Sequence, residues 1–121
     1  MGTKAVFAFA VESLTENGSS RFLSRIIGMT SDGSPKNLVY LAKRCVVLAR
    51  HKGILTRFRQ RDRVAIGIVR DALVAESRGW LFVDDNRNAD WVSNSAIFDP
   101  AKNTVQLFAE HFEYPTGFVK V

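Results

Sequence analysis

The residues most suited to chemistry in this chain are basic, and they are concentrated in one segment. Nine of the 28 residues from 36 to 63 are Lys or Arg, and the one acidic residue among them is Asp62. The segment holds more than half of the 17 basic residues in a chain whose net charge is +5. Positive charge gathered in this way favours an anionic partner, such as a nucleic acid or an acidic protein.

The second half of the basic segment has a period of two residues. Every other residue there is an arginine: Arg57, Arg59, Arg61 and Arg63. An extended strand would place these four guanidinium groups on one face over roughly 20 Å, whereas a helix would scatter them around its axis. We therefore expect a strand, which the β-branched residues at 64–69 would continue. Guanidinium groups suit phosphates because they present a planar set of hydrogen-bond donors.

Together with its aromatic residues, the basic segment predicts a binding surface for RNA or single-stranded DNA. The candidate residues are Lys43, Arg44, Arg50, Lys52, Arg57, Arg59, Arg61, Arg63, Tyr40 and Phe58. The basic side chains would hold phosphates, while Tyr40 and Phe58 would stack on exposed bases. A single strand is favoured over a duplex because the sequence contains no recognisable helix-turn-helix or zinc finger.

The same surface fits two other interpretations. Tyr and Arg are frequent anchors of protein interfaces, so the chain could be a small inhibitor or adaptor that docks on an acidic protein. The charges could also serve only to solvate a helix face and to protect an edge strand from aggregation. Competition with unrelated nucleic acid would separate binding to nucleic acid from binding to a protein.

One enzymatic function, that of a metal-dependent nuclease, stays open. Four carboxylates follow the arginines and could bind Mg²⁺ beside a phosphate. They are Asp71, Glu76, Asp84 and Asp85. No Lys or His follows them at a recognisable spacing to act as a base or to stabilise charge. We therefore expect non-catalytic binding and assign no catalytic residue, no metal ligand and no cofactor.

Other classes of site find little support in the residue types. A Cys-His nucleophile is disfavoured because Cys45 and His51, six residues apart in one predicted helix, would lie on different sides of it. One Cys and two His residues are too few and too scattered for a zinc site. The eight glycines form no phosphate-binding loop.

The composition indicates one globular domain that spans residues 1–121. The chain is 46% hydrophobic and 24% charged, as expected for a protein that buries a core. No apolar run approaches the roughly 18 residues that a membrane helix needs, so we expect a soluble protein that does not enter a membrane. Because the single Cys45 cannot form an internal disulfide, a cytoplasmic location is expected.

The elements that would position the basic residues begin with a buried strand at residues 6–11. A short helix is expected next, from Ser19 or Ser20 to Gly28. Its apolar side would carry Phe22, Leu23, Ile26 and Ile27. The clearest helix spans residues 36–51, with Ser34 and Pro35 before it and Gly53 after it. Its buried stripe would be Leu38, Leu41, Ala42, Cys45, Leu48 and Ala49, and its outer arc Lys36, Tyr40, Lys43, Arg44, Val47, Arg50 and His51.

The last third of the chain predicts a β-meander. Strands are expected at residues 80–83, 91–98 and 104–112, separated by turns. The fold would be α+β, with a sheet of about five antiparallel or mixed strands and two helices on one face, in the order β-α-α-β-β-β-β. Phe108 and Phe112 share one face of the last strand and could form the face of a homodimer.

Overall fold

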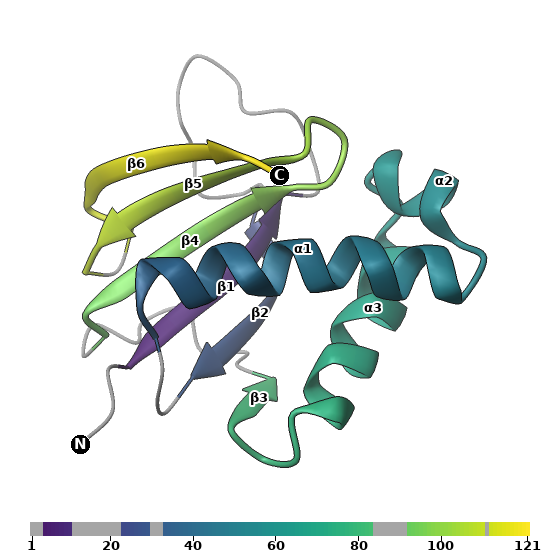
Figure 1. Ribbon diagram of the computed structural model, residues 1–121, viewed down its shortest axis with the longest axis horizontal. Helices are drawn as coiled ribbons and strands as arrows, with labels where there is room; N and C mark the ends of the chain where they lie inside the picture. The colour runs from purple at the N-terminus through teal and green to yellow at the C-terminus, as the bar shows by residue number, and fades with distance from the viewer. Residues whose placement is uncertain (1–3, 11–22, 30–32, 84–91, 111) are drawn as a thin grey trace.

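The computed structural model describes residues 4–10, 23–29, 33–83, 92–110 and 112–121. This part of the chain contains six strands and three helices (Figure 1). In chain order they are β1 (Ala5–Ala10), β2 (Leu23–Met29), α1 (Pro35–His51), α2 (Leu55–Arg59), α3 (Arg63–Glu76), β3 (Leu81–Val83), β4 (Asn94–Asp99), β5 (Thr104–Ala109) and β6 (Tyr114–Lys120).

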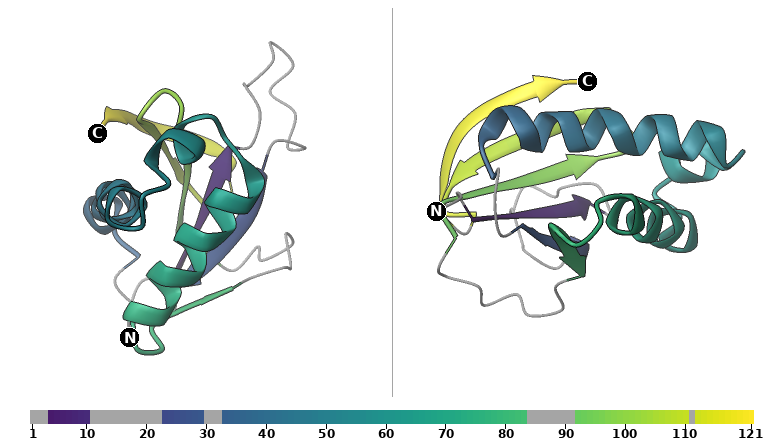
Figure 2. Two further views of the ribbon diagram at one scale, coloured as in Figure 1. Left: turned by 90° about the vertical axis from the view of Figure 1, so that its right-hand side faces the viewer. Right: turned by 60° about the horizontal axis from the view of Figure 1, so that its bottom comes forward.

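The strands form one mixed sheet in the order β3-β2-β1-β4-β5-β6. β1 and β4 run parallel to each other, and the other neighbouring pairs are antiparallel. α1 packs over β4 and β5, while α3 packs against β2 and β3, so both cover the same face of the sheet (Figures 1 and 2). The predicted α+β class, with a mixed sheet and helices packed on one face, is confirmed.

α1 follows from its sequence pattern. Ser34 is its N-cap, because the hydroxyl oxygen accepts a hydrogen bond from the backbone N–H of Asn37 at 3.3 Å, and Pro35 opens the first turn. The predicted apolar stripe is buried: Leu38, Leu41, Ala42, Cys45, Leu48 and Ala49. After the helix the chain turns at Gly53, whose φ of 71° is favourable for glycine and strained for other residues. The predicted helix is confirmed.

The core on the helix side of the sheet centres on four phenylalanines. Phe7 and Phe9 come from β1, Phe98 from β4 and Phe58 from α2, and all four are fully buried. Their contacting rings have centroids 5.3 to 6.2 Å apart, in edge-to-face and tilted arrangements. Aromatic pairs with this geometry add stability beyond the area that they bury. The cluster therefore anchors α2 against the centre of the sheet.

The short helix predicted to end at Gly28 is wrong, since these residues form the strand β2. β2 pairs antiparallel with β1 on one side and with β3 on the other. The sheet thus satisfies the backbone groups of β2, and this long-range pairing outweighs the helical spacing of a few apolar residues. The predicted N-caps, Ser19 and Ser20, and the apolar Phe22 lie outside the described residues.

The strand predicted for the alternating arginines is also wrong, because α2 and α3 occupy its place. Asp62 caps α3, since its carboxylate accepts hydrogen bonds from the backbone N–H groups of Val64 at 2.8 Å and Ala65 at 3.2 Å. A helical period is carried by apolar residues that point into the core: Ala65, Ile66, Val69 and Leu73. Burial of this stripe favours a helix where the spacing of the arginines alone indicated a strand.

The three strands predicted for the last third of the chain correspond to β3, β4 and β5. β4 and β5 pair with each other as a meander requires, whereas β3 pairs with β2 rather than with β4. β5 ends at Ala109 rather than at residue 112, because Glu110 and Phe112 each take a φ of 60°, which a strand does not allow. The chain then forms β6, which the sequence pattern did not predict. The described chain therefore has six strands and three helices in the order β-β-α-α-α-β-β-β-β, which corrects the predicted counts and order.

Candidate functional site

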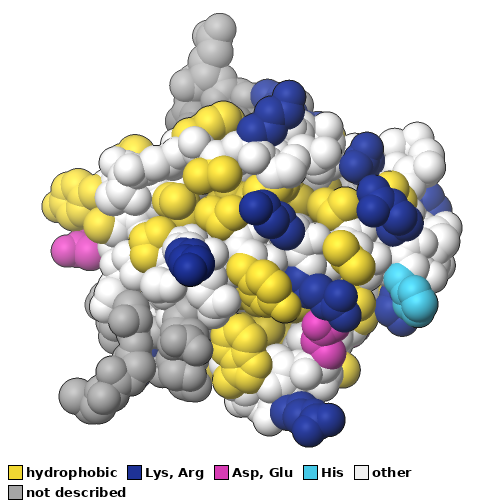
Figure 3. All heavy atoms as spheres, in the orientation of Figure 1, with side chains coloured by type: hydrophobic (Ala, Val, Ile, Leu, Met, Phe, Trp, Pro, Cys, Tyr) yellow, Lys and Arg dark blue, Asp and Glu magenta, His cyan; other side chains and the backbone are white. Residues whose placement is uncertain are grey.

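The outward face of α1 carries a line of cations. Lys36, Lys43 and Arg50 are spaced seven residues apart, so they follow one side of the helix at intervals of about 10 Å. All three are exposed, and between them Tyr40 and Val47 leave 54% and 46% of their surface exposed. Figure 3 shows Lys and Arg side chains spread over this face of the molecule, with hydrophobic side chains among them. The outer arc predicted for α1 is exposed as expected, except for Arg44, which is half-buried.

Two further exposed cations, Lys52 and Arg59, follow α1 in the chain. Lys52 caps α1 and Arg59 ends α2, which packs against α1, and both residues are exposed. Within the described chain, neither these two nor the three cations of α1 form an ion pair. We call these five residues the basic surface: Lys36, Lys43, Arg50, Lys52 and Arg59.

Two other arginines of the predicted surface are held by carboxylates. Arg44 donates three hydrogen bonds to Glu76, at 2.8, 3.0 and 3.2 Å, and this partner raises the pKa of the guanidinium. Arg57 donates a hydrogen bond to Asp62 at 3.1 Å. This bond, with the backbone N–H groups that Asp62 caps, lowers the pKa of the carboxyl. Arg63 is exposed at the first turn of α3.

Arg61 and Phe58 have structural roles that remove them from a binding surface. Arg61 has a φ of 57° and donates hydrogen bonds to both carboxylate oxygens of Asp99, at 3.0 and 2.9 Å. Only 17% of the Arg61 side chain and 8% of the Asp99 side chain are exposed. Phe58 is fully buried against Phe9 and Phe98, which corrects the prediction that it stacks on bases. The four alternating arginines thus do not form one array.

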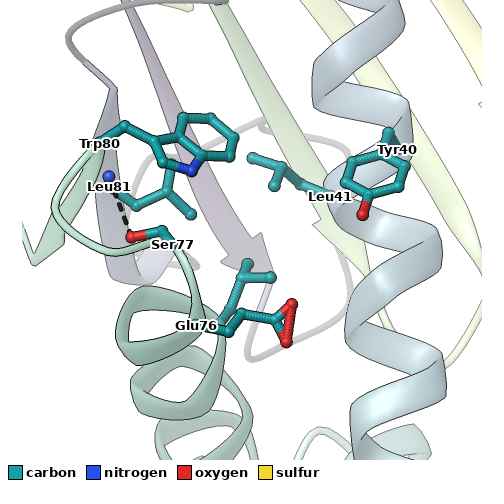
Figure 4. Close-up of a pocket in the computed structure, with 7 residues that line it drawn as sticks. Tyr40, Leu41, Glu76, Ser77, Trp80 and Leu81 are labelled. Atoms are coloured by element: carbon teal, nitrogen blue, oxygen red, sulfur yellow. Dashed lines mark hydrogen bonds between the residues drawn. The ribbon is translucent and has the colours of Figure 1, made fainter.

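A pocket of about 150 Å³ lies beside the basic surface, between α1, the end of α3 and the start of β3 (Figure 4). It is lined by Tyr40, Leu41, Leu73, Glu76, Ser77, Trp80 and Leu81. Tyr40 and Trp80 lie on opposite sides of it, with the Leu41 side chain between them and the Glu76 carboxylate at one end. The pocket therefore combines two aromatic side chains and three leucines with the polar groups of Glu76 and Ser77.

The sequence pattern did not single out Trp80 as a site residue, although it predicted a strand that begins at this residue. Arg78 and Gly79 both have a positive φ, of 57° and 105°. The Ser77 hydroxyl accepts a hydrogen bond from the backbone N–H of Leu81 at 3.3 Å, which closes the turn around Trp80. The available signal was a tryptophan placed directly after a tight turn, where part of a large ring stays at the surface.

The structure describes two of the four carboxylates that the nuclease hypothesis requires. Glu76 is bonded to an arginine of α1, and Asp71 pairs with Arg70 at 2.8 Å on the outer side of α3. Asp84 and Asp85 lie outside the described residues. Across the segments that the structure describes, no group of three or more His, Cys, Asp or Glu residues could hold a metal ion. The nuclease hypothesis gains no geometric support from the residues that can be placed.

Cys45 and His51 are separated by their surroundings as well as by their positions on α1. Cys45 is fully buried, and burial raises the pKa of its thiol, so that the reactive thiolate is disfavoured. His51 is exposed at the last turn of the helix. These two residues do not form a nucleophile and a base.

The sheet face predicted for a homodimer carries Phe108 and Phe112, whose rings meet edge to face at 5.8 Å. Phe108 is 9% exposed, so most of it is already covered within the chain. Phe118 of β6 lies on the same face of the sheet, and 67% of its surface is exposed. Among the described residues, Phe118 therefore gives this side exposed apolar surface, and the homodimer stays a prediction.

No helix in the described segments is long and apolar enough to cross a membrane. The function of the chain is inferred from its own side chains, because in comparisons with known proteins no family model, no curated protein and no solved structure matches it.

Proposed function

We propose that this protein binds RNA or single-stranded DNA through the basic surface, without catalysing a reaction. The observation that carries the proposal is the line of Lys36, Lys43 and Arg50 on α1, which are exposed and form no ion pair within the described chain. Cations placed in this way neutralise phosphates and release the counterions that surround a nucleic acid. Tyr40, exposed in the same line, offers a ring on which a base can stack.

The shape of the surface favours a single strand. α1 lies along the sheet with one side buried, so a partner meets an exposed face rather than a helix that projects into a groove (Figure 2). A single strand can follow this face with its bases turned towards Tyr40. The bases of a duplex are stacked on each other and have no face to offer to an aromatic side chain.

Fluorescence anisotropy with labelled single-stranded RNA, single-stranded DNA and duplex DNA tests the proposal. Contacts from all five cations predict a slope of log K against log salt of about −3.5, or a loss of roughly a hundredfold in affinity from about 50 to 200 mM salt. Both single strands should bind more tightly than the duplex and stay intact with Mg²⁺ or Mn²⁺. If neither single strand binds at about 50 mM salt, the proposal is wrong.

A second candidate function is favoured by exposed apolar residues on α1 and α3. Val64 and Ile68, one turn apart on α3, leave 60% and 39% of their surface exposed, and Val47 on α1 leaves 46%. Protein interfaces combine such apolar area with a polar, charged rim. An inhibitor or adaptor that docks on an acidic protein would bury these exposed apolar residues in its interface. Its complex should persist in excess unrelated nucleic acid, whereas a complex based on phosphate contacts should be displaced.

Two further expectations belong to the proposal. A cytoplasmic location fits the buried Cys45, which is not in a disulfide. A homodimer through the sheet face that carries Phe118 would place two basic surfaces on one assembly. Sedimentation equilibrium tests the homodimer, and a monomer mass at every protein concentration would exclude it.

A further inference from the structure

We propose that the pocket between Tyr40 and Trp80 holds one unpaired base of the bound strand. This inference rests on the proposed binding of single-stranded nucleic acid, and it adds a site that recognises the base rather than the phosphate. We call this site the base pocket, and its residues are Tyr40, Leu41, Leu73, Glu76, Ser77, Trp80 and Leu81.

The size of the base pocket suits one planar base. Its volume of about 150 Å³ is close to that of a cavity that accepts benzene. Pockets for drug-sized ligands and cofactors begin at about 300 Å³, so a whole nucleotide cofactor is too large. One planar base, with its sugar and phosphate left outside, matches this space.

The base pocket offers two aromatic side chains on which a planar base can stack. Tyr40 and Trp80 present aromatic rings from opposite sides, and Leu41 lies between them (Figure 4). Stacking on aromatic side chains is a common way to hold unpaired bases, and it tolerates different base identities because every base has such a face. The partly exposed Tyr40 and Trp80 therefore gain burial when a base enters.

Glu76 supplies a hydrogen-bond acceptor at one end of the base pocket. Its carboxylate accepts three hydrogen bonds from Arg44, and 34% of its side chain is exposed. Two carboxylate oxygens offer about four acceptor positions, so capacity remains for an N–H group at the edge of a base. The guanidinium of Arg44 balances the negative charge, which would otherwise repel a nearby phosphate.

Tyr40 connects the base pocket to the basic surface. It also lines a second, open hollow together with Ser34, Lys36 and Asn37. Lys43 lies three residues after Tyr40, less than one turn further along α1. A strand with one base in the pocket would therefore carry its flanking phosphates past Lys36 and Lys43.

The test compares two single-stranded DNA oligonucleotides of equal length and charge, one of deoxycytidines and one abasic throughout, by fluorescence anisotropy at low salt. Wild-type protein should bind the base-bearing strand between roughly fivefold and a hundredfold more tightly. Tyr40→Ala and Trp80→Ala should each lower the affinity for the base-bearing strand towards that for the abasic strand. Their affinity for the abasic strand should change less than about twofold, because the basic surface is intact. Trp80→Phe should retain most of the preference, since it keeps an aromatic face.

A second readout uses the fluorescence of Trp80 itself. The chain has two tryptophans, so a Trp91→Phe variant leaves Trp80 as the one emitter. The base-bearing strand should quench this emission by stacking, and the abasic strand should not. The same titration with a cytidine RNA strand shows which sugar is preferred.

The outcomes separate the proposal for the base pocket from the proposed function. If wild-type protein binds both strands equally, the pocket does not hold a base, whereas the proposed binding through the basic surface is unaffected. If it binds neither, the proposed function fails as well. If the preference for the base-bearing strand persists in both alanine variants, the proposal for the base pocket is also wrong, because another part of the chain must then hold the base.

Discussion

Arg61 and Asp99, 38 positions apart in the sequence, are joined by two hydrogen bonds of 3.0 and 2.9 Å. Arg61 lies in the turn between α2 and α3, while Asp99 ends β4 and also accepts hydrogen bonds from the backbone N–H groups of Ala101 and Lys102. This one carboxylate therefore fixes the β4–β5 turn and ties the helices to it. An arginine from the middle of the basic segment thus stabilises the fold.

Asp99→Asn should destabilise the protein strongly. The amide oxygen can still accept the hydrogen bonds of the turn, but the guanidinium of Arg61 loses its counter-charge where little solvent reaches it. We expect the free energy of unfolding in urea to fall by about 3–5 kcal/mol. The matched control is Asp71→Asn, at an ion pair with Arg70 in which 65% of the Asp71 side chain is exposed, and it should cost less than about 1 kcal/mol. Equal losses in the two variants would show that the Arg61–Asp99 pair has no special role.

Phe58→Ala should cost about 3–5 kcal/mol of unfolding free energy, because it leaves a cavity between α2 and the sheet. Tyr40→Ala removes an aromatic ring of similar size from an exposed position and should cost less than about 1 kcal/mol. Chemical denaturation measures both values. A small loss for Phe58→Ala would contradict its placement in the core.

The carboxyl of Asp62 should titrate below the usual range for aspartate, as followed by ¹³C NMR of the side chain. The hydrogen bond from Arg57 is the main cause of the lowered pKa, with the N–H groups of Val64 and Ala65 adding to it. Arg57→Gln should therefore raise this pKa. A folded-state pKa below the unfolded value means that the stabilisation is present above the unfolded pKa and is lost as pH falls through the folded pKa. An unchanged titration in Arg57→Gln would assign the shift to the backbone donors alone.

The thiol of Cys45 should resist alkylation in the folded protein. It is fully buried on the inner side of α1, and burial raises its pKa, so the thiolate that reacts with iodoacetamide is scarce. Labelling at about pH 8, followed by mass spectrometry, should be slow in buffer and fast in denaturant. Fast labelling without denaturant would mean that α1 opens readily or packs differently.

The first helix could be predicted from sequence because all of its signals agree. A capping serine, a proline in the first turn, a buried stripe at helical spacing and a following glycine each point to α1. Its outer arc follows from the same geometry, so the exposed positions of Lys43 and Arg50 could be predicted as well. Local sequence signals are therefore enough to predict this part of the basic surface.

The arginines after α1 could not be placed in the same way, because their period of two conflicted with a weaker helical pattern. Asp62 followed by apolar Ala65, Ile66 and Val69 is the signal for α3, and it lies in the same residues that suggested a strand. Which arginines meet a carboxylate depends on long-range contacts, such as that of Arg61 with Asp99. Sequence spacing carries no information on those contacts.

The base pocket could not be predicted from the sequence, because it also depends on long-range contacts. Tyr40 and Trp80 come from two elements 40 positions apart, and only the packing of α1 beside α3 and β3 brings them to one pocket. β2 and β6 were missed because their pairing is decided by neighbouring strands rather than by their own residues.

The measurement that tests the central claim most directly is the affinity of Lys43→Gln/Arg50→Gln for a single strand at about 100 mM salt. The control, Lys102→Gln/Lys120→Gln, removes the same charge from exposed positions outside the basic surface. We predict that the first variant binds at least about tenfold more weakly, with a salt slope shallower by roughly 1.4, while the control changes less than about twofold. Equal weakening in both variants would mean that only net charge matters, and it would contradict the assignment of binding to the face of α1.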